Sequence, residues 1–241
     1  MTHGSVAPPD AGPPPARSPA PWTPASPEPR VFHPVWLIRH APTSWTGQRW
    51  CGRADPPLDR AGRAVAASLA AELAAELPDD VIIRSSPARR ARSTAAAIAA
   101  ASRRVVALDP DLLEVDVGRV EGLTWEELSS REPVLASAIL EGRMIDWPGG
   151  ETRAEIAARA ERAADAIARI AVERPVAVVS HGALIHVLRE VLLDAGLGPV
   201  EPAPAADAWS ASQPGAPASS PIAPPALPAG GVLRLVGTVR R

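Results

Sequence analysis

Two histidines and at least two arginines stand where short apolar runs of this sequence end. Arg39 and His40 follow one run, His181 follows another, and Arg90 lies a few residues beyond a third. An arginine fork binds phosphate oxygens bidentately, and a neutral imidazole is a nucleophile that forms covalent intermediates. If the runs are parallel strands, their carboxyl ends meet at one rim, which is where open α/β sheets bind ligands. The pattern therefore predicts a site for a dianionic phosphoryl group.

Phosphoryl transfer to a histidine also needs an acid, because the alkoxide that leaves must take up a proton. Glu114, in the stretch 112–116, is the first candidate for this acid. Asp116 and Glu121 remain as alternatives. The second histidine, in its protonated form, can stabilise the charge that develops on the equatorial oxygens.

The elements that must position these groups alternate along the chain. Short β-branched runs predict four buried strands, at 35–38, 81–83, 105–108 and 176–179. Between them lie alanine-rich stretches with helical spacing, for example Val65, Leu69 and Leu73. Apolar strands that alternate with helices favour a mostly parallel sheet covered on both faces. The expected fold class is therefore α/β.

Three helix starts are also visible in the sequence. Ser86 followed by Pro87 predicts the N-cap and the first residue of a helix that runs to about residue 101. Capping boxes begin at Thr124 and Thr152, each with a glutamate three residues later. One helix is therefore expected directly after the second strand, and two more before the fourth.

Proline marks the two ends of the chain, which has 241 residues and suits one domain with tails. Ten prolines fall in residues 1–30, predicted to be a disordered tail, and nine fall in the predicted low-complexity segment 199–230. The folded domain is expected over 31–198. Residues 231–241 are expected to add a last strand to it.

Composition excludes several classes of function. The net charge is −2, so no nucleic-acid partner is expected. None of the 25 basic residues is lysine, which excludes a P-loop kinase and Schiff-base chemistry, because both need a lysine. A single cysteine, Cys51, excludes an intrachain disulfide and favours a cytoplasmic setting. No apolar run has the roughly 18 residues of a membrane span, and the N-terminal stretch lacks the apolar core of a secretory signal. No spacing typical of a metal site occurs, so neither a metal nor a cofactor is expected.

Six blocks of the sequence, in order, resemble the histidine phosphatase superfamily, that is, the phosphoglycerate mutase-like family. They are LIRHAPTSW (37–45), GRADPPLDRAG (52–62), SSPARRARSTA (85–95), LLEVDVGRVEGLTWEE (112–127), PGGET (148–152) and VVSHG (178–182). Together they span about residues 35–195. The resemblance implies a three-layer α/β/α sandwich and a phosphohistidine intermediate.

The resemblance also implies a role for each of the matching polar residues. It makes His40 the nucleophile and Arg39 the residue beside it that grips the phosphoryl group. Arg90 is the second clamp, and His181 with the amide of Gly182 completes the pocket. The acid/base glutamate of the family corresponds to the candidate acid in the stretch 112–116.

The chain departs from the family's pattern near the nucleophile. Ala41 stands where the family usually has glycine, and Pro42 replaces the next acidic residue. Thr46 stands where an asparagine often binds phosphate, and its hydroxyl can donate similarly. Cys51 and Gly52 correspond to a position where some members contact substrate. A cysteine-phosphatase mechanism is not expected, because that chemistry needs an arginine at position 57, which is proline.

The combined interpretation is a metal-independent phosphomonoesterase that acts on a small phosphorylated metabolite. A phosphoglycerate-type mutase is the alternative within enzymes. The stretch of 66 residues between Glu114 and His181 disfavours it, because mutases of this family usually carry a longer insertion there. A non-catalytic phosphate-binding or scaffold protein that uses its proline-rich tails is the alternative outside enzymes.

The sequence leaves the substrate and the oligomeric state open. It favours the branches that act on α-ribazole phosphate or on sugar phosphates. Specificity is expected from residues 43–57 and 115–148. Within them, Arg53 and Arg143 are candidates to contact a second anionic group on the substrate.

Overall fold

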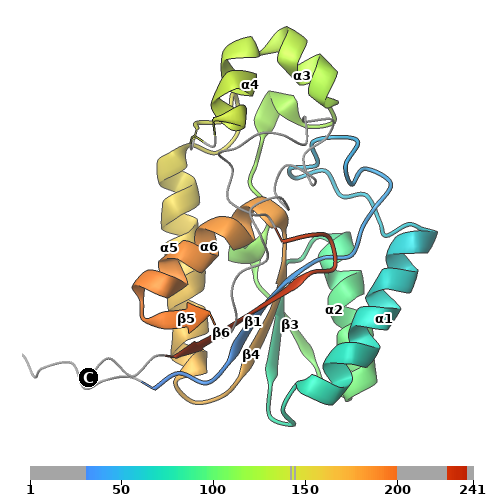
Figure 1. The fold of residues 1–241 in the computed structure, drawn as a ribbon, viewed down its shortest axis with the longest axis vertical. Helices are drawn as coiled ribbons and strands as arrows, with labels where there is room; N and C mark the ends of the chain where they lie inside the picture. Colours follow the sequence, from blue (N-terminus) through green and yellow to red (C-terminus); the bar gives the residue numbers. More distant parts are fainter. Residues whose placement is uncertain (1–30, 142, 144, 200–226, 238–241) are drawn as a thin grey trace, which may run out of the picture.

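The computed structural model describes residues 31–141, 143, 145–199 and 227–237, which form a six-stranded sheet with helices packed around it (Figure 1). The spatial order of the strands is β3-β2-β4-β1-β6-β5. Their bounds are β1 Val35–Arg39, β2 Ile82–Ser85, β3 Val106–Leu108, β4 Val176–Ser180, β5 Leu197–Pro199 and β6 Val232–Gly237. The expected α/β class is confirmed, and each of the four predicted strands is present within one or two residues of its predicted bounds.

Four neighbouring strands of the sheet are parallel. β1 pairs with β4, β4 with β2 and β2 with β3, whereas β6 runs antiparallel to both β1 and β5. Every residue of β4 and the first four residues of β1 are buried, as expected for central strands covered on both faces. The carboxyl ends of β1, β2 and β4 therefore meet at one rim.

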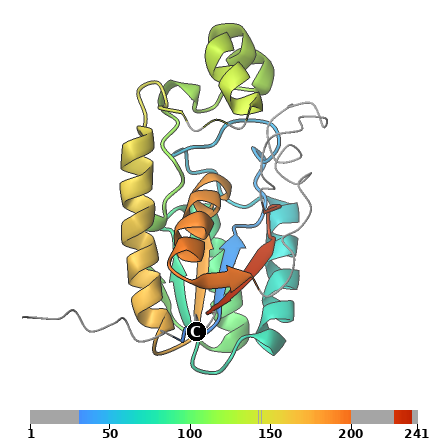
Figure 2. The same ribbon diagram turned by 60° about the vertical axis from the view of Figure 1, so that its left-hand side comes forward.

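Helices cover both faces of the sheet, which gives the expected three-layer α/β/α sandwich (Figure 2). One face carries α1 (Arg60–Glu76) and α2 (Arg89–Ser102), and the other carries α5 (Arg153–Ala171) and α6 (Gly182–Asp194). Strand β1 supplies both layers of the core because its side chains alternate. Val35 and Leu37 pack with α5 and α6, whereas Trp36 and Ile38 pack with α1 and α2.

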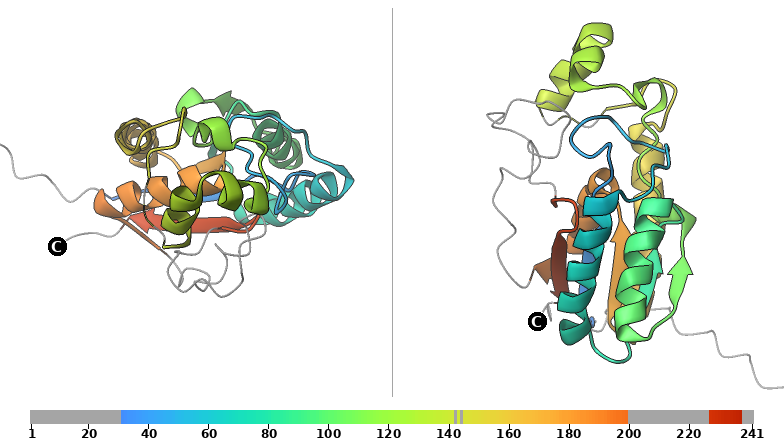
Figure 3. Two further views of the ribbon diagram at one scale, coloured as in Figure 1. Left: turned by 90° about the horizontal axis from the view of Figure 1, so that it is seen from above. Right: turned by 90° about the vertical axis from the view of Figure 1, so that its right-hand side faces the viewer.

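Residues 110–152 leave the sheet and stand above the strand ends (Figures 1 and 3). They contain two 3₁₀ turns and two short helices: Pro110–Leu112, Gly118–Val120, α3 (Trp125–Arg131) and α4 (Pro133–Leu140). The buried apolar residues of this excursion, among them Val117, Leu128 and Ile139, form one cluster with Ile156 of α5, and residues of α6 pack against this cluster. The excursion that covers the strand ends is therefore packed onto α5 and α6.

The predicted start of α2 is wrong, whereas both predicted capping boxes are confirmed. α2 begins at Arg89 rather than at Pro87, and its N-cap, Ala88, has no side chain that can cap. Asp55 supplies the cap from a distant loop, since its Oδ1 accepts from the Arg89 N–H at 2.7 Å. The boxes that begin at Thr124 and Thr152 open α3 and α5 as expected.

The predicted tail 1–30 lies outside the described residues, and so do residues 200–226 of the predicted segment 199–230. The end of that segment is described and packs on the domain, because Leu227 is buried in the apolar cluster beneath α5 and α6. β6 lies within the stretch 231–241 where a last strand is predicted. Neither β5 nor α4 is predicted from the sequence.

Candidate active site

The two histidines of the predicted site lie side by side at the ends of the central strands. Arg39 at the end of β1 is opposite Ser180 at the end of β4 in the parallel ladder. The backbone N–H of His40 donates to Ser180 O at 3.0 Å, which fixes the chain where both strands end. The ring centroids of His40 and His181 are 5.1 Å apart, with an interplanar angle of 62°. Strand pairing therefore brings together histidines that are far apart in the sequence.

His40 is held in one tautomer by its own backbone. Its Nδ1 lies 2.7 Å from Ala41 O, so Nδ1 carries the ring proton and Nε2 carries the lone pair. Nε2 accepts a hydrogen bond from Arg90 Nε at 3.2 Å. Burial lowers the pKa of His40 well below 6.5, and the positive charges of Arg90 and Arg39 lower it further. The ring is therefore neutral, as a nucleophile toward phosphorus must be.

We expect the His40 ring to remain neutral when the free protein is acidified below pH 6.5. The lowered pKa means that the folded state binds fewer protons than the unfolded chain, so the free energy of unfolding falls as the pH drops through this range. Nitrogen NMR of the histidine side chains measures the protonation of this ring directly. A His40 titration midpoint at or above 6.5 would contradict the described geometry.

Arg90 is positioned by a loop as well as by its own helix. Its side chain comes from the first turn of α2 and is almost completely buried. Nη1 donates to Ala54 O at 2.7 Å and Nη2 donates to Gly52 O at 3.1 Å. These two carbonyls fix the guanidinium plane beside His40. The loop that supplies them therefore sets the geometry of the clamp.

Arg39 lines the same cavity and lies against the start of α6. Its Nη1 donates to Leu227 O at 2.9 Å, whereas its buried Nε has no partner among the described residues. A Cβ at Gly182 would lie 3.2 Å from the Arg39 Cζ, so a side chain at that position would press on the guanidinium. Glycine at the start of α6 therefore leaves room for Arg39.

His181 lies behind His40 and is completely buried. Its Nε2 is 2.8 Å from the Ser86 hydroxyl. Either atom of this pair can be the donor, and Nδ1 has no partner among the described residues. Burial lowers the pKa of His181 well below 6.5, and the charge of Arg90 lowers it further, which favours a neutral ring over the protonated ring expected from the sequence.

Glu114 reaches the site from the loop that follows β3. Its Oε1 accepts from the N–H of Val115 at 3.0 Å and of Leu184 at 3.2 Å, and its Oε2 accepts from the N–H of Ala183 at 3.5 Å. Two of these donors are unsatisfied amides of the first turn of α6. The carboxyl group is therefore held at the same helix start that adjoins Arg39.

These groups open into a cavity of about 200 Å³ beneath the 110–152 excursion. Its inner wall includes Arg39, His40, Arg90, Glu114 and Gly182, and His181 backs this wall without lining it. Neither Asp116 nor Glu121, the alternative acids, lines the cavity. Of the three candidate acids, the geometry therefore favours Glu114.

The three other predicted binding residues, Thr46, Cys51 and Gly52, all line the cavity. The Thr46 hydroxyl accepts from Thr43 N at 2.9 Å. Burial raises the pKa of the Cys51 thiol to about 11, so it stays protonated at neutral pH and is a poor nucleophile. Gly52 has φ +48°, and a Cβ there would meet Val117 Cγ2 at 2.6 Å.

Of the two arginines predicted to contact a second anionic group on the substrate, one lines the cavity and the other does not. Arg143 lines the cavity and pairs with Glu141 at 2.6 Å on the surface. Arg53 does not line it, and its Nη2 lies 3.5 Å from Glu151 Oε1. The structure therefore leaves Arg143 as a candidate contact and assigns Arg53 to an ion pair.

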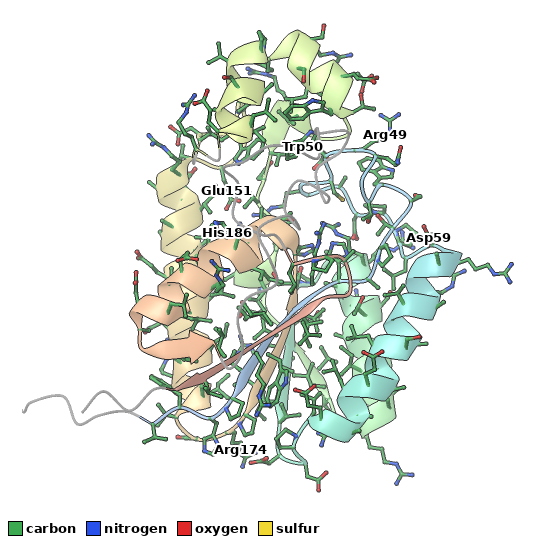
Figure 4. All side chains as sticks on the ribbon, viewed as in Figure 1. Arg49, Trp50, Asp59, Glu151, Arg174 and His186 are labelled. Carbon is green, nitrogen blue, oxygen red and sulfur yellow. The ribbon has the colours of Figure 1, made fainter. Side chains whose placement is uncertain are left out.

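The outer wall of the cavity comes largely from the ranges 43–57 and 115–148, where the sequence predicts the specificity surface, but the sequence singles out neither its tryptophans nor His186. Trp45, Trp50 and Trp147 line it, and the rings of Trp50 and Trp147 have centroids 5.7 Å apart. His186 also lines it, since it lies four residues after Gly182 on the same face of α6 (Figure 4). Figure 4 shows Arg49 and Trp50 on the loop above the strand ends and His186 on the helix. No local pattern marks these residues, because the loop and the helix meet only in the fold.

Two features are absent from the part of the chain that the structure describes. No helix there has both the length and the apolar character that a bilayer-spanning helix needs. No three histidine, cysteine or acidic side chains gather there as a metal site would require.

The sandwich and the paired histidines at its strand ends place the chain among the phosphoglycerate mutase-like α/β proteins. The family model of the histidine phosphatase superfamily (branch 1) matches residues 35–208, and the chain belongs to this superfamily. The resemblance seen in the six sequence blocks is thereby confirmed.

This chain matches different shares of the length of its curated relatives. A bifunctional protein of Mycobacterium tuberculosis is 37% identical over 163 residues, which cover 67% of this chain and 44% of the relative. The chain thus spans less than half the length of that relative. Glucosyl-3-phosphoglycerate phosphatase of the same organism is 32% identical over 65% of this chain and 74% of its own. A metal-independent phosphoserine phosphatase of Arabidopsis thaliana is 32% identical over 64% and 66%.

Solved structures show the same fold. A protein titled mycobacterial hydrolase 1 has a TM-score of 0.67 and 27% identity, over 86% of this chain and 90% of its own. The native structure of a mycobacterial glucosyl-3-phosphoglycerate phosphatase has a TM-score of 0.60 and 30% identity, over 67% and 80%. The similarity therefore extends over the sheet and its helices.

Proposed function

We propose that this protein is a metal-independent phosphomonoesterase that works through a phosphohistidine at His40. The observation that carries the proposal is the His40 Nε2 lone pair, which belongs to a neutral ring and accepts from Arg90. Arg39 adds a second guanidinium at the same cavity wall. A nucleophile that shares a cavity wall with two arginines suits a phosphoryl group, whose oxygens bear the negative charge. The relatives named as phosphatases support the same reaction.

The first half of the reaction transfers the phosphoryl group to the protein. His40 Nε2 forms a bond to phosphorus as the bond to the ester oxygen breaks. Arg39 and Arg90 stabilise the equatorial oxygens, and His181 completes the pocket behind His40. Glu114 gives its proton to the leaving oxygen, and the alcohol departs neutral.

The second half returns the nucleophile to its starting state. Water attacks the phosphorus of phospho-His40, and the ionised carboxylate of Glu114 takes up a proton from that water. The N–P bond breaks, inorganic phosphate leaves, and His40 Nε2 regains its lone pair. Glu114 is then protonated again and ready for the next ester.

The proposed substrate is a small phosphorylated metabolite. The relatives' names include phosphoserine and glucosyl-3-phosphoglycerate phosphatases, both of which take such esters. The alcohol half of the substrate would contact the outer wall, where Trp50 and Trp147 offer flat apolar faces. A cytoplasmic setting is proposed because the chain has a single cysteine, a partly buried free thiol, so that no intrachain disulfide can form.

Purified protein is expected to hydrolyse p-nitrophenyl phosphate and some members of a panel of sugar phosphates and phosphoserine, with rates that EDTA leaves essentially unchanged. The reason is that the proposed charges on the transferring group are met by arginines rather than by a metal. Release of inorganic phosphate is the measurement, with a phosphoglycerate mutase assay alongside. Strict dependence on Mg²⁺ or Zn²⁺, or binding without turnover of any ester, would refute the proposal.

A further inference from the structure

Arg159 is a buried arginine on α5 that the reaction described above does not use. Its side chain is only 7% exposed and it does not line the cavity. Its Nε and Nη2 donate to the two carboxylate oxygens of Glu151, at 2.7 and 2.8 Å. Such a two-point pair holds the guanidinium plane in one orientation. The plane therefore directs the remaining N–H groups at fixed targets.

Those targets are the carbonyls of the segment that carries Glu114. Arg159 Nη1 donates to Asp111 O at 2.9 Å and to Leu113 O at 2.7 Å, and Nη2 donates to Glu114 O at 3.4 Å. One side chain thus binds three carbonyls within four residues. The peptides on both sides of the Glu114 Cα are fixed in this way.

Glu151 holds the same segment from its other end. Its Oε2 accepts from Asp116 N at 2.8 Å, and its own backbone N–H donates to Asp116 O at 2.9 Å. Residues 111–116 are therefore tied down on either side of Glu114. Among the described residues, the partners of the carboxyl group itself are the N–H of its neighbour Val115 and two amides of α6.

We infer that Arg159, oriented by Glu151, is the positioning residue for Glu114 in the proposed reaction. It never touches the substrate and acts by setting where the Glu114 backbone lies. A proton donor must be within hydrogen-bond distance of the leaving oxygen, and a displacement of about 1 Å costs as much as 10²-fold in rate. The inference rests on the proposed function, since it assigns Arg159 a role in the proton transfer.

The test compares Arg159→Lys with the wild-type protein in single-turnover phosphorylation of His40. Lysine keeps the charge but offers a single ammonium group, which cannot bind a carboxylate in two-point fashion and three carbonyls at once. We expect the rate with an alkyl phosphate to fall about 10- to 100-fold, and the rate with p-nitrophenyl phosphate to fall much less, because only the alkyl leaving group needs the proton. A purely structural role would slow both substrates equally.

Arg162→Ala is the matched control. Arg162 lies on the same helix and binds the same segment, through the side chain of Asp111 at 2.9 Å, but it is largely exposed and touches no carbonyl next to Glu114. Its replacement is expected to leave the ratio of the two rates unchanged. Glu151→Gln, which removes the charge that orients Arg159, is expected to shift the ratio in the same direction as Arg159→Lys and serves if the lysine variant does not fold.

Introducing Arg159→Lys into a Glu114→Gln protein tests the positioning role of Arg159 separately from the proposed phosphatase function. If Arg159 acts through Glu114, Arg159→Lys will not change the substrate ratio further in that background. Equal losses on both substrates, or an unchanged ratio in both the Arg159→Lys and Glu151→Gln proteins, would overturn the inference while wild-type turnover still supports the phosphatase. Absence of wild-type turnover on either ester would instead refute the proposed function.

Discussion

Replacing His40 with alanine is expected to abolish hydrolysis of every phosphomonoester, a loss of roughly 10⁴-fold or more, as for removal of other covalent nucleophiles. The variant retains Arg39 and Arg90, which still offer their guanidinium groups to a phosphate. It lacks the imidazole lone pair that accepts from Arg90 at the cavity wall. The measurement is kcat/KM with p-nitrophenyl phosphate, because this ester makes the least demand on the acid.

Two controls make the His40 result specific. His33→Ala removes an exposed histidine outside the cavity and is expected to change nothing. Retained inhibitor binding would show that the His40→Ala site is intact, with vanadate as the probe and calorimetry as the readout. If a well-folded His40→Ala protein hydrolysed the ester at the wild-type rate, His40 could not be the nucleophile.

Glu114→Gln is expected to slow phosphorylation of His40 by an alkyl phosphate about 10²–10⁴-fold, the usual contribution of general acid catalysis. Glutamine keeps the size and polarity of the side chain but has no proton to give to an alkoxide. Nitrophenolate is a stable anion and hardly needs one, so the loss with p-nitrophenyl phosphate should be far smaller. Single-turnover rates are the proper measurement, since slow dephosphorylation would hide the difference in steady state.

The alternative acids provide the control for the Glu114 prediction. Glu121→Gln removes a carboxylate whose Oε2 accepts from Ala54 N at 2.6 Å, outside the cavity lining. Asp116→Asn removes one whose Oδ1 accepts from Gly118 N at 2.9 Å. Neither is expected to change the ratio of the two substrates. If the Glu114→Gln protein lost rate equally with both esters, one of these two would be the next candidate.

The sheet could be predicted from the sequence because its signals are local. β1 and β4 are unbroken apolar runs, and each leads directly to a histidine, so strand and site residue are visible together. The capping boxes at Thr124 and Thr152 are equally local, since the side chain and the amide it binds are three residues apart. Parallel pairing of such strands then requires His40 and His181 to meet.

The parts that could not be predicted depend on contacts distant in sequence. Asp55 caps α2 from 34 residues away, so Ser86 was the only cap that local spacing could suggest. Leu227 O binds Arg39 across 188 residues, at the end of a proline-rich stretch that looks unable to pack. Arg159 is one of many arginines on an alanine-rich helix. Its importance comes from the carbonyls above it, and a sequence pattern does not encode where those carbonyls lie.

The central claim is that His40 carries the phosphoryl group, and rapid quenching of the enzyme with phosphorus-labelled substrate tests it most directly. The account predicts label on the protein within a single turnover, located at His40 by peptide mapping. The adduct should be labile to acid and stable to alkali, as a phosphoramidate is, and it should be missing from the His40→Ala protein. Label on a serine or an aspartate, or turnover with no labelled protein at any time, would contradict the account.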